Sequence, residues 1–258
     1  MSATDEAKFW YLKKFNLATA FVHLFQGILI LIISVDFSVP IKATYLTEES
    51  GKLFQETKVL FDIQLGPLIA LFLFLAALDH FLVATVRYDW YVKNLKNKIN
   101  YARWIEYSFS ASVMIIIIAM LSGIYDVGSL IAIFALTAVM SLCGMVMEVH
   151  NQTTKDTKWI SYIVGCIAGI VPWLVIGLYF YFSETSGGDI PRFVYVIYIT
   201  LALLYNSFAI NMYLQYKKWG PWNDYLFGEK VYIILSLIAK SALAWQVYGG
   251  TRGGPSRA

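Results

Sequence analysis

Long runs of apolar residues alternate with short polar clusters along this chain. Seven of the runs approach or exceed the roughly 20 residues that an α-helix needs to cross the hydrocarbon core of a bilayer. Since that core offers no water to the backbone, a helix is the expected structure for each run. The predicted spans are residues 11–35, 65–87, 101–125, 127–150, 159–182, 191–216 and 225–248. The pattern therefore predicts an all-α membrane protein, a single domain (1–258) built as a seven-transmembrane-helix bundle.

The polar connections carry less regular patterns. The longest connection is residues 36–64, and its stretches 41–46 and 53–60 alternate apolar and polar positions, which predicts a short β-hairpin. Pro172 inside the fifth span predicts a kink in that helix. The Gly-rich end, residues 249–258, is expected to be a flexible tail.

Composition narrows the class of protein. With 59% hydrophobic and 14% charged residues, the chain is not an ordinary soluble domain, and the lipid bilayer is its expected surroundings. A formal net charge of +3 is too small to indicate a nucleic-acid partner. Cys143 and Cys166 lie inside apolar runs and are expected to be small core residues without a disulfide. The polar start, Met1 to Lys14, leads directly into a full-length span, so no removable signal peptide is predicted.

The distribution of Lys and Arg predicts the orientation in the membrane. Eleven of these residues flank the spans on the side of the amino terminus, and six lie on the other side. Because cytoplasmic loops carry an excess of Lys and Arg, the amino terminus is predicted to be cytoplasmic and the carboxyl terminus extracellular. This places the 36–64 loop outside the cell. The remaining three positive residues lie within spans: Arg103, Lys230 and Lys240.

Lys240 is the most informative of these three. It lies deep in the last apolar run, where a charged side chain costs about 2.5–3.5 kcal/mol even on the lenient insertion scale, so a functional role is expected. The alternative is a lysine that extends its ammonium group to the membrane surface. Chemistry that needs a lysine in an apolar cavity is mostly Schiff-base formation with an aldehyde.

A carboxylate on the third span is the expected partner of Lys240. Glu106 lies about two turns inside that span, which enters from the same side as the last one. Since the Lys240 side chain tilts towards the amino end of its helix, the two charged groups are expected to meet at one depth. A carboxylate beside the cation makes burial tolerable. The alternative is that Glu106 lies at the membrane surface, paired with Arg103 or water.

Other polar residues fall near this pair. Arg103, Glu106 and Ser110 share one helical face, which Met114 continues, and Ser236 lies one turn before Lys240. His23 and His80 lie at matched depths and are either satisfied core residues or part of a hydrated pocket. Asp79 falls on another face and has no predicted place. Three residues near the inner helix ends are interpreted as interfacial: Glu148, His150 and Glu229.

Four segments are similar to a known family of retinal proteins: Arg103–Ser108, Gly165–Trp173, Asn206–Ala209 and Ser236–Gln246. The chain resembles the heliorhodopsins over essentially its whole length. The resemblance implies a rhodopsin-like fold that binds all-trans retinal covalently through Lys240, with Glu106 as counterion. It also implies a cytoplasmic-side water cavity at His23 and His80, a homodimer and an inverted membrane orientation, in agreement with the charge count.

Retinal needs a slot of aromatic and flexible apolar side chains. By helix position, the predicted lining residues are Tyr107, Ser110, Met114, Trp173, Tyr205 and Ser236, followed by Met140 and Gly144 on the fourth span. Each of these residues has core packing as its alternative role.

Two departures from the commoner microbial pumps favour a sensor. Those proteins usually have an aspartate one turn before the lysine, where this chain has Ser236. Outward proton pumps resemble one another in a carboxylate about eleven residues after the counterion, where this chain has Ile117, which cannot relay a proton. The predicted function is a light-sensing photoreceptor, not an enzyme, that signals to an unknown cytoplasmic partner.

Two other functions remain open. The chain is alternatively a light-driven or light-gated proton transporter that uses Asp79, His80 and Glu148. A membrane metalloenzyme holding zinc at His23 and His80 has the right ligand types, but the sequence has no paired-ligand motif of the His-Glu-x-x-His kind. No metal is therefore expected.

Overall fold

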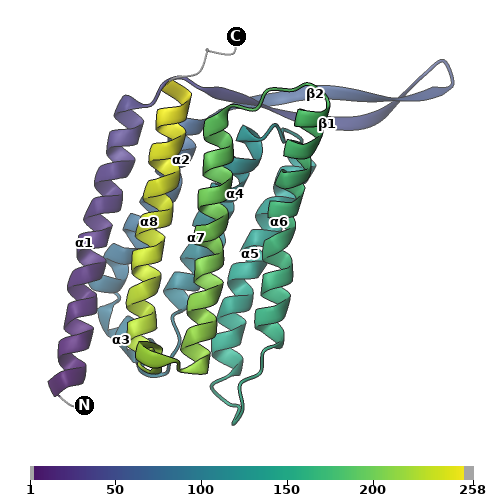
Figure 1. The fold of residues 1–258 in the computed structure, drawn as a ribbon. Helices are drawn as coiled ribbons and strands as arrows, with labels where there is room; N and C mark the ends of the chain where they lie inside the picture. Colours follow the sequence, from purple (N-terminus) through teal and green to yellow (C-terminus); the bar gives the residue numbers. More distant parts are fainter. Residues whose placement is uncertain (1–2, 253–258) are drawn as a thin grey trace.

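A computed structural model of the chain describes residues 3–252, with side chains from residue 6 onward. Within this part lie seven helices that are long and apolar enough to cross a membrane. They form one bundle whose two ends carry opposite termini (Figure 1). The predicted all-α seven-helix fold is therefore confirmed. The seven helices are α1 (Ala3–Ile33), α2 (Leu65–Ala84), α4 (Tyr101–Leu121), α5 (Val127–His150), α6 (Ile160–Thr185), α7 (Arg192–Lys217) and α8 (Tyr225–Arg252).

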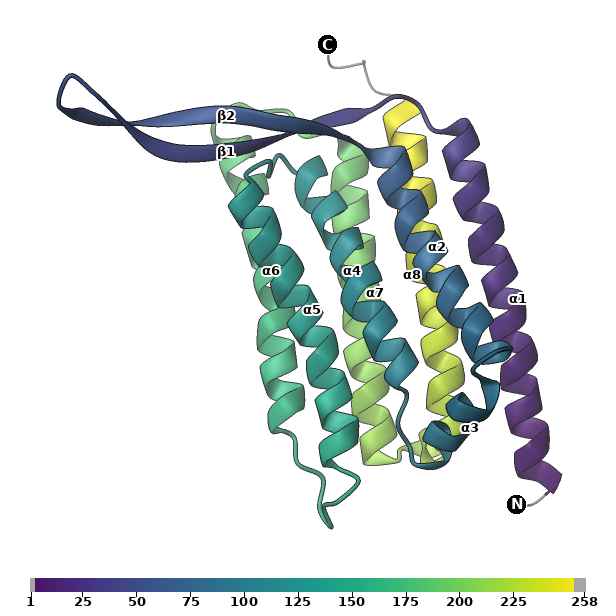
Figure 2. The same cartoon turned by 180° about the vertical axis from the view of Figure 1, so that it is seen from behind.

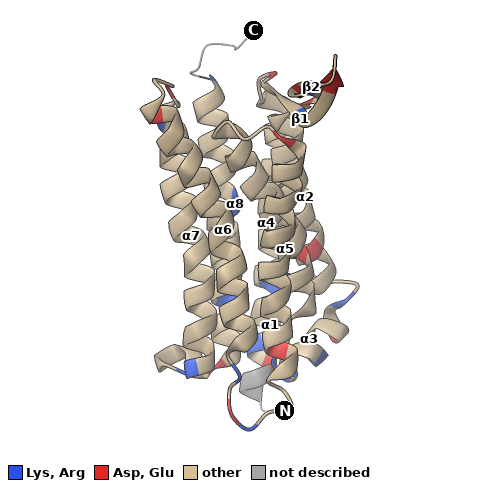
Figure 3. Cartoon of the chain, turned by 90° about the vertical axis from the view of Figure 1, so that its right-hand side faces the viewer, with Lys and Arg blue, Asp and Glu red and all other residues tan. Residues whose placement is uncertain are grey.

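The bundle has an apolar outside and keeps its charges near its ends. Large aliphatic side chains such as Ile32 and Leu203 are 74% and 70% exposed, as expected for helix faces that contact lipid tails. Charged positions gather towards the two ends and are sparse along the middle of the helices (Figure 3). Cys143 and Cys166 are both free cysteines, but Cys143 is half-buried and Cys166 is exposed, so the prediction that they are core residues was wrong.

Two helices begin at capping side chains that satisfy exposed backbone N–H groups. The Asn100 side chain accepts a hydrogen bond from the Arg103 backbone at 3.1 Å, at the start of α4. The Asp126 carboxylate accepts one from the Ser129 backbone at 2.8 Å, at the start of α5. Such caps stabilise a helix by about 1 kcal/mol. The same hydrogen bond lowers the pKa of the Asp126 carboxyl below its ordinary value.

A short helix, α3 (Tyr88–Lys96), lies between α2 and α4 and was not predicted. Its Tyr91 and Leu95 are buried together with Phe9 and Leu12 of α1, while its lysines stay in the last turn. The spacing of Tyr91 and Leu95 is the helical one, but the segment is too short and polar to stand out beside the spans.

The connection between α1 and α2 is a hairpin that is longer than predicted. Strands β1 (Ser38–Glu49) and β2 (Lys52–Gln64) pair antiparallel across a turn in which Ser50 and Gly51 both have positive φ (54° and 77°). Two positive φ values in the turn suit the twist of a two-residue hairpin. The hairpin crosses the end of the bundle that holds the carboxyl terminus and projects beyond α6 (Figures 1 and 2).

Contacts at its base fix the hairpin to the bundle. Val39 and Ile41 are buried in the apolar core, and the Lys42 backbone N–H donates to the Tyr125 carbonyl at 2.9 Å. That carbonyl is free because α4 ends at Leu121, four residues earlier than predicted, in a turn where Gly123 has a φ of 94°.

The last helix continues further than predicted. Gly249 and Gly250 were expected in a flexible tail, but α8 extends to Arg252. The Gly250 backbone lies so close to the Phe193 ring that a Cβ there would be 2.0 Å from it, so the glycine permits packing against α7. The rest of the predicted tail, residues 253–258, lies outside the described residues.

Candidate functional site

Lys240 lies inside the bundle beside Glu106. Its side chain is almost fully buried, and Nζ lies 3.3 Å from Oε2 of Glu106 and donates to Ser236 Oγ at 2.8 Å. The predicted approach of the two charges is thus present, and the alternative of a lysine at the membrane surface is wrong. Ser236 faces Lys240 because residues four apart share a helix face. The Tyr107 ring completes the surroundings, with its centroid 5.0 Å from Nζ.

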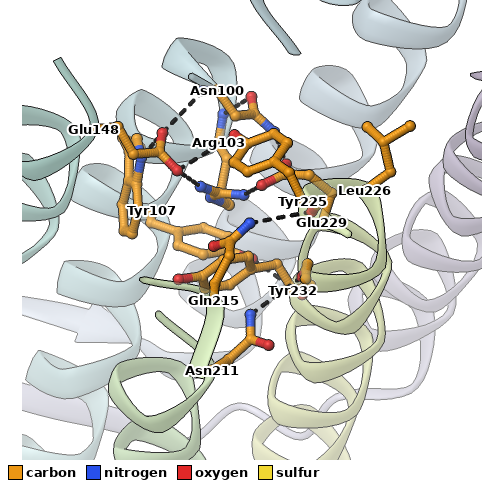
Figure 4. A network of polar contacts seen from close by, with 12 residues as sticks. Asn100, Arg103, Tyr107, Glu148, Asn211, Gln215, Tyr225, Leu226, Glu229 and Tyr232 are labelled. Atoms are coloured by element: carbon orange, nitrogen blue, oxygen red, sulfur yellow. Dashed lines mark hydrogen bonds and ion pairs between the residues drawn. The ribbon is translucent and has the colours of Figure 1, made fainter. Parts of the chain in front are cut away.

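Arg103 lines a small cavity together with Glu106 and His80, but it forms no ion pair with Glu106. Its guanidinium instead forms ion pairs with Glu229 of α8 and, at 2.5 Å, with Glu148 of α5. These two carboxylates are 1% and 2% exposed, so their interpretation as interfacial residues was wrong. The planar fork of an arginine suits two carboxylates at once. Figure 4 shows the arrangement around Arg103.

Neighbouring side chains satisfy the remaining oxygens of these carboxylates. Asn100 donates from its side chain to Glu229 at 2.7 Å and from its backbone to Glu148 at 2.9 Å. Trp104 Nε1 donates to Glu148 at 2.7 Å. We call Asn100, Arg103, Trp104, Glu148 and Glu229 the arginine cluster. It connects the amino ends of α4 and α8 with the carboxyl end of α5. His150 is exposed, as its interfacial interpretation requires.

The two histidines lie together, next to the Lys240 pair. The rings of His23 and His80 stack with centroids 5.8 Å apart and an interplanar angle of 12°. Nδ1 of His80 is hydrogen-bonded to the Asn16 side chain at 2.7 Å. Both nitrogens of His23 are buried without a partner among the described residues. The role of these histidines in a hydrated cavity stays a prediction.

Three aromatic and apolar residues predicted to line a retinal slot pack in the core that also contains the neighbour of Lys240 in the chain. Met114 and Trp173 belong to the same buried cluster as Ala239, the residue before Lys240. Trp173 and Tyr205 are in edge-to-face contact at 5.3 Å, and the Tyr205 hydroxyl donates to a backbone carbonyl of α4 at 2.8 Å. A buried amine with a carboxylate partner and an apolar, aromatic neighbourhood fits a Schiff-base-linked polyene.

Three further predicted lining residues are buried or packed between helices. Ser110 is fully buried, and its hydroxyl has no partner among the described residues. A Cβ on Gly144 would lie 2.4 Å from the Trp104 ring, so this glycine gives Trp104 the room to reach Glu148. Met140 packs against Gly169 of α6 in the same way. The contact of these residues with retinal stays a prediction.

Comparisons with known proteins agree with this geometry. A sequence model of the heliorhodopsin family matches residues 12–252. The fold is similar to the crystal structure of the light-driven proton pump LR (Mac) from Leptosphaeria maculans, with a TM-score of 0.63, 13% identity and 98% of both chains covered. At that identity the likeness shows the fold alone. No curated protein matches the sequence.

Proposed function

We propose that this chain, which belongs to the heliorhodopsin family, is a light sensor that binds all-trans retinal through a Schiff base at Lys240. Retinal supplies a polyene that absorbs visible light and isomerises. The observation that carries the proposal is the buried pair of Lys240 and Glu106, 3.3 Å apart. A lone amine at this depth is costly, and the carboxylate keeps it charged.

The chain's own residues then move one proton. In the dark, the Lys240 nitrogen carries the proton and Glu106 the negative charge. After illumination the proton passes to a Glu106 oxygen, the nitrogen keeps its electron pair, and both groups become neutral. Ser236, which accepts a hydrogen bond from the nitrogen at 2.8 Å, cannot take the charge. Loss of the ion pair removes an attraction between α4 and α8, and this biases the bundle towards a second arrangement.

The residues that follow Glu106 on α4, towards the hairpin, favour a sensor over a pump. Ile115, Ile117 and Ile118 are fully buried on α4 and offer no group that can relay a proton towards the hairpin end. A proton transporter is the second candidate, because Asp79 and His80 line a cavity together with Glu106. In this candidate, Glu148 of the arginine cluster would continue the path.

We further propose the cellular arrangement that the sequence predicts. The amino terminus lies in the cytoplasm, the hairpin lies outside the cell, and the protein works as a homodimer. Its signal passes to a cytoplasmic partner, and no enzymatic activity is required of it. The Lys and Arg excess at the end that holds the amino terminus supports this orientation.

Illuminated vesicles distinguish the two candidate functions. We expect vesicles that contain the protein with retinal to show no sustained pH change in light. Vesicles with the Lys240→Ala variant serve as the control for heating and light scattering. A sustained change that a protonophore abolishes, and that the variant lacks, would establish transport instead.

Replacing Glu106 tests its proposed role as counterion. In Glu106→Gln the visible band should shift to longer wavelength, because the negative charge that holds the positive charge at the nitrogen is gone. Absorption spectra across a pH series measure the shift, with Glu229→Gln as a control that removes a different buried carboxylate. A band that stays in place at every pH would assign the role to another group.

A further inference from the structure

Asp79 lies between two hollows of the bundle, and the proposed function gives it no role. It lines a small inner cavity of about 20 Å³ that Glu106 also lines. The same two carboxyl groups line a larger groove of about 480 Å³ between α2 and α4. Asp79 on α2 and Glu106 on α4 therefore line the same two hollows from neighbouring helices. Within residues 3–252, Asp79 has neither a hydrogen bond nor an ion pair.

The inner cavity is bordered by buried polar atoms that lack partners. These atoms are Oε1 of Glu106, Nε of Arg103 and the Tyr232 hydroxyl, none of which has a hydrogen bond within the described part of the chain. Unpaired buried polar groups cost free energy and call for water or another donor. A volume of about 20 Å³ suffices for one water molecule, which needs two to four polar partners. Arg103 pairs through its NH1 and NH2 groups with Glu229 and Glu148, and Lys240 faces Oε2, so no described cation is paired with Oε1.

We propose that Asp79 and Glu106 share one proton through water in this cavity and act together as the counterion of the Lys240 nitrogen. This inference rests on the proposed function. Asp79 holds the proton in the dark, because within the described residues no hydrogen bond or ion pair compensates a charge on its half-buried carboxyl group. Glu106 is the carboxylate, because Lys240 lies beside its Oε2. The couple then carries one negative charge, and the proton of Asp79 is donated towards Oε1 of Glu106.

Several other titratable or charged groups face the couple and must be considered in any pH experiment. None of them is a further carboxyl group at the nitrogen, because Glu229 is bound to Arg103. The groups around the couple are His23 on α1, His80 on α2, Arg87 before α3, Tyr91 on α3, Arg103 and Tyr107 on α4, and Glu229, Tyr232 and Lys240 on α8.

The test is a pH titration of the visible band in wild type, Asp79→Asn and Asp79→Glu. At neutral pH, Asp79→Asn should absorb close to wild type, because Asp79 is neutral there. On raising the pH, wild type should show a step to shorter wavelength as the couple loses its shared proton and gains a second negative charge. Asp79→Asn should lack this step, and Asp79→Glu should keep it at another midpoint. Asp89→Asn, at an exposed position of α3, is the matched control.

A second readout does not depend on the pigment. An infrared titration of the retinal-free protein should show a carboxylic-acid C=O band that disappears at alkaline pH and is missing in Asp79→Asn. If that variant does not fold, the band must change position in Asp79→Glu. An alkaline step and an infrared band that are identical in wild type and both Asp79 variants would overturn the inference. Failure of wild type to form any pigment would overturn the proposed function, whereas the infrared titration would still decide on Asp79.

Discussion

Lys240→Ala protein purified with added all-trans retinal is expected to show no absorbance band in the visible range. Among the lysines that the structure describes, Lys240 alone is buried and lies beside a buried carboxylate. Schiff-base formation needs an amine, and the red shift of retinal into the visible needs a positive charge at that nitrogen. An alanine supplies neither. The loss should be complete rather than partial, and an absorption spectrum of the purified variant measures it.

Lys230→Ala is the matched control for this experiment. Lys230 lies on the same helix, but its Nζ lies 5.0 Å from the centroid of the Tyr11 ring and has no described carboxylate partner. Its replacement should leave the visible band intact and sensitive to hydroxylamine in the light. A visible band in Lys240→Ala that hydroxylamine still bleaches would assign the linkage to another amine.

Arg103→Leu is expected to lower the free energy of unfolding by about 3–5 kcal/mol, the range for breaking a buried ion pair by removing one partner. The variant leaves Glu148 and Glu229 buried without their cation, and both are at most 2% exposed. Unfolding followed by circular dichroism as denaturant is added measures the change. The visible band should survive in the folded fraction, because Arg103 does not contact Lys240.

Two further variants show whether the loss comes from unpaired charge. Adding Glu148→Gln and Glu229→Gln to Arg103→Leu removes the uncompensated carboxylates, so part of the stability should return. Lys8→Gln breaks the exposed ion pair with Asp224 and should cost at most about 1 kcal/mol. A loss in Arg103→Leu no larger than that in Lys8→Gln would mean that the arginine cluster does not stabilise the bundle.

The long-range features of the fold followed from the apolar runs, because a bilayer leaves few choices for a segment of that length. The depth argument also brought Lys240 to Glu106, since helical rise and side-chain tilt are fixed quantities. Boundaries were less accurate where local contacts decide them. The extension of α8 to Arg252 depends on Gly250 packing against Phe193, and no single-residue preference indicates such a contact.

The arginine cluster shows where sequence reasoning fails for a site. Arg103 and Glu106 share a helix face and line one cavity, as their spacing suggested. Arg103 lies one turn nearer the amino end of α4, however, and its long side chain forms ion pairs with Glu148 and Glu229 there. Each of these glutamates stands near a helix end in the sequence, where exposure is the normal expectation. Only the packing of α5 and α8 against α4 makes them buried partners.

Two described ion pairs join α4 to α8: Glu106 with Lys240, and Arg103 with Glu229. They differ in how easily the charge of the cation is lost. Moving one proton abolishes the connection at Lys240, whereas a guanidinium keeps its charge under all ordinary conditions. Under the proposed function, light would release the middle of α8, while the amino end of α8 would stay bound to α4 and, through Arg103 and Glu148, to α5. Under the proposed function, the three helix ends that the arginine cluster joins would then move together. A protein bound to these three helix ends would then detect their joint tilt rather than the movement of a single helix.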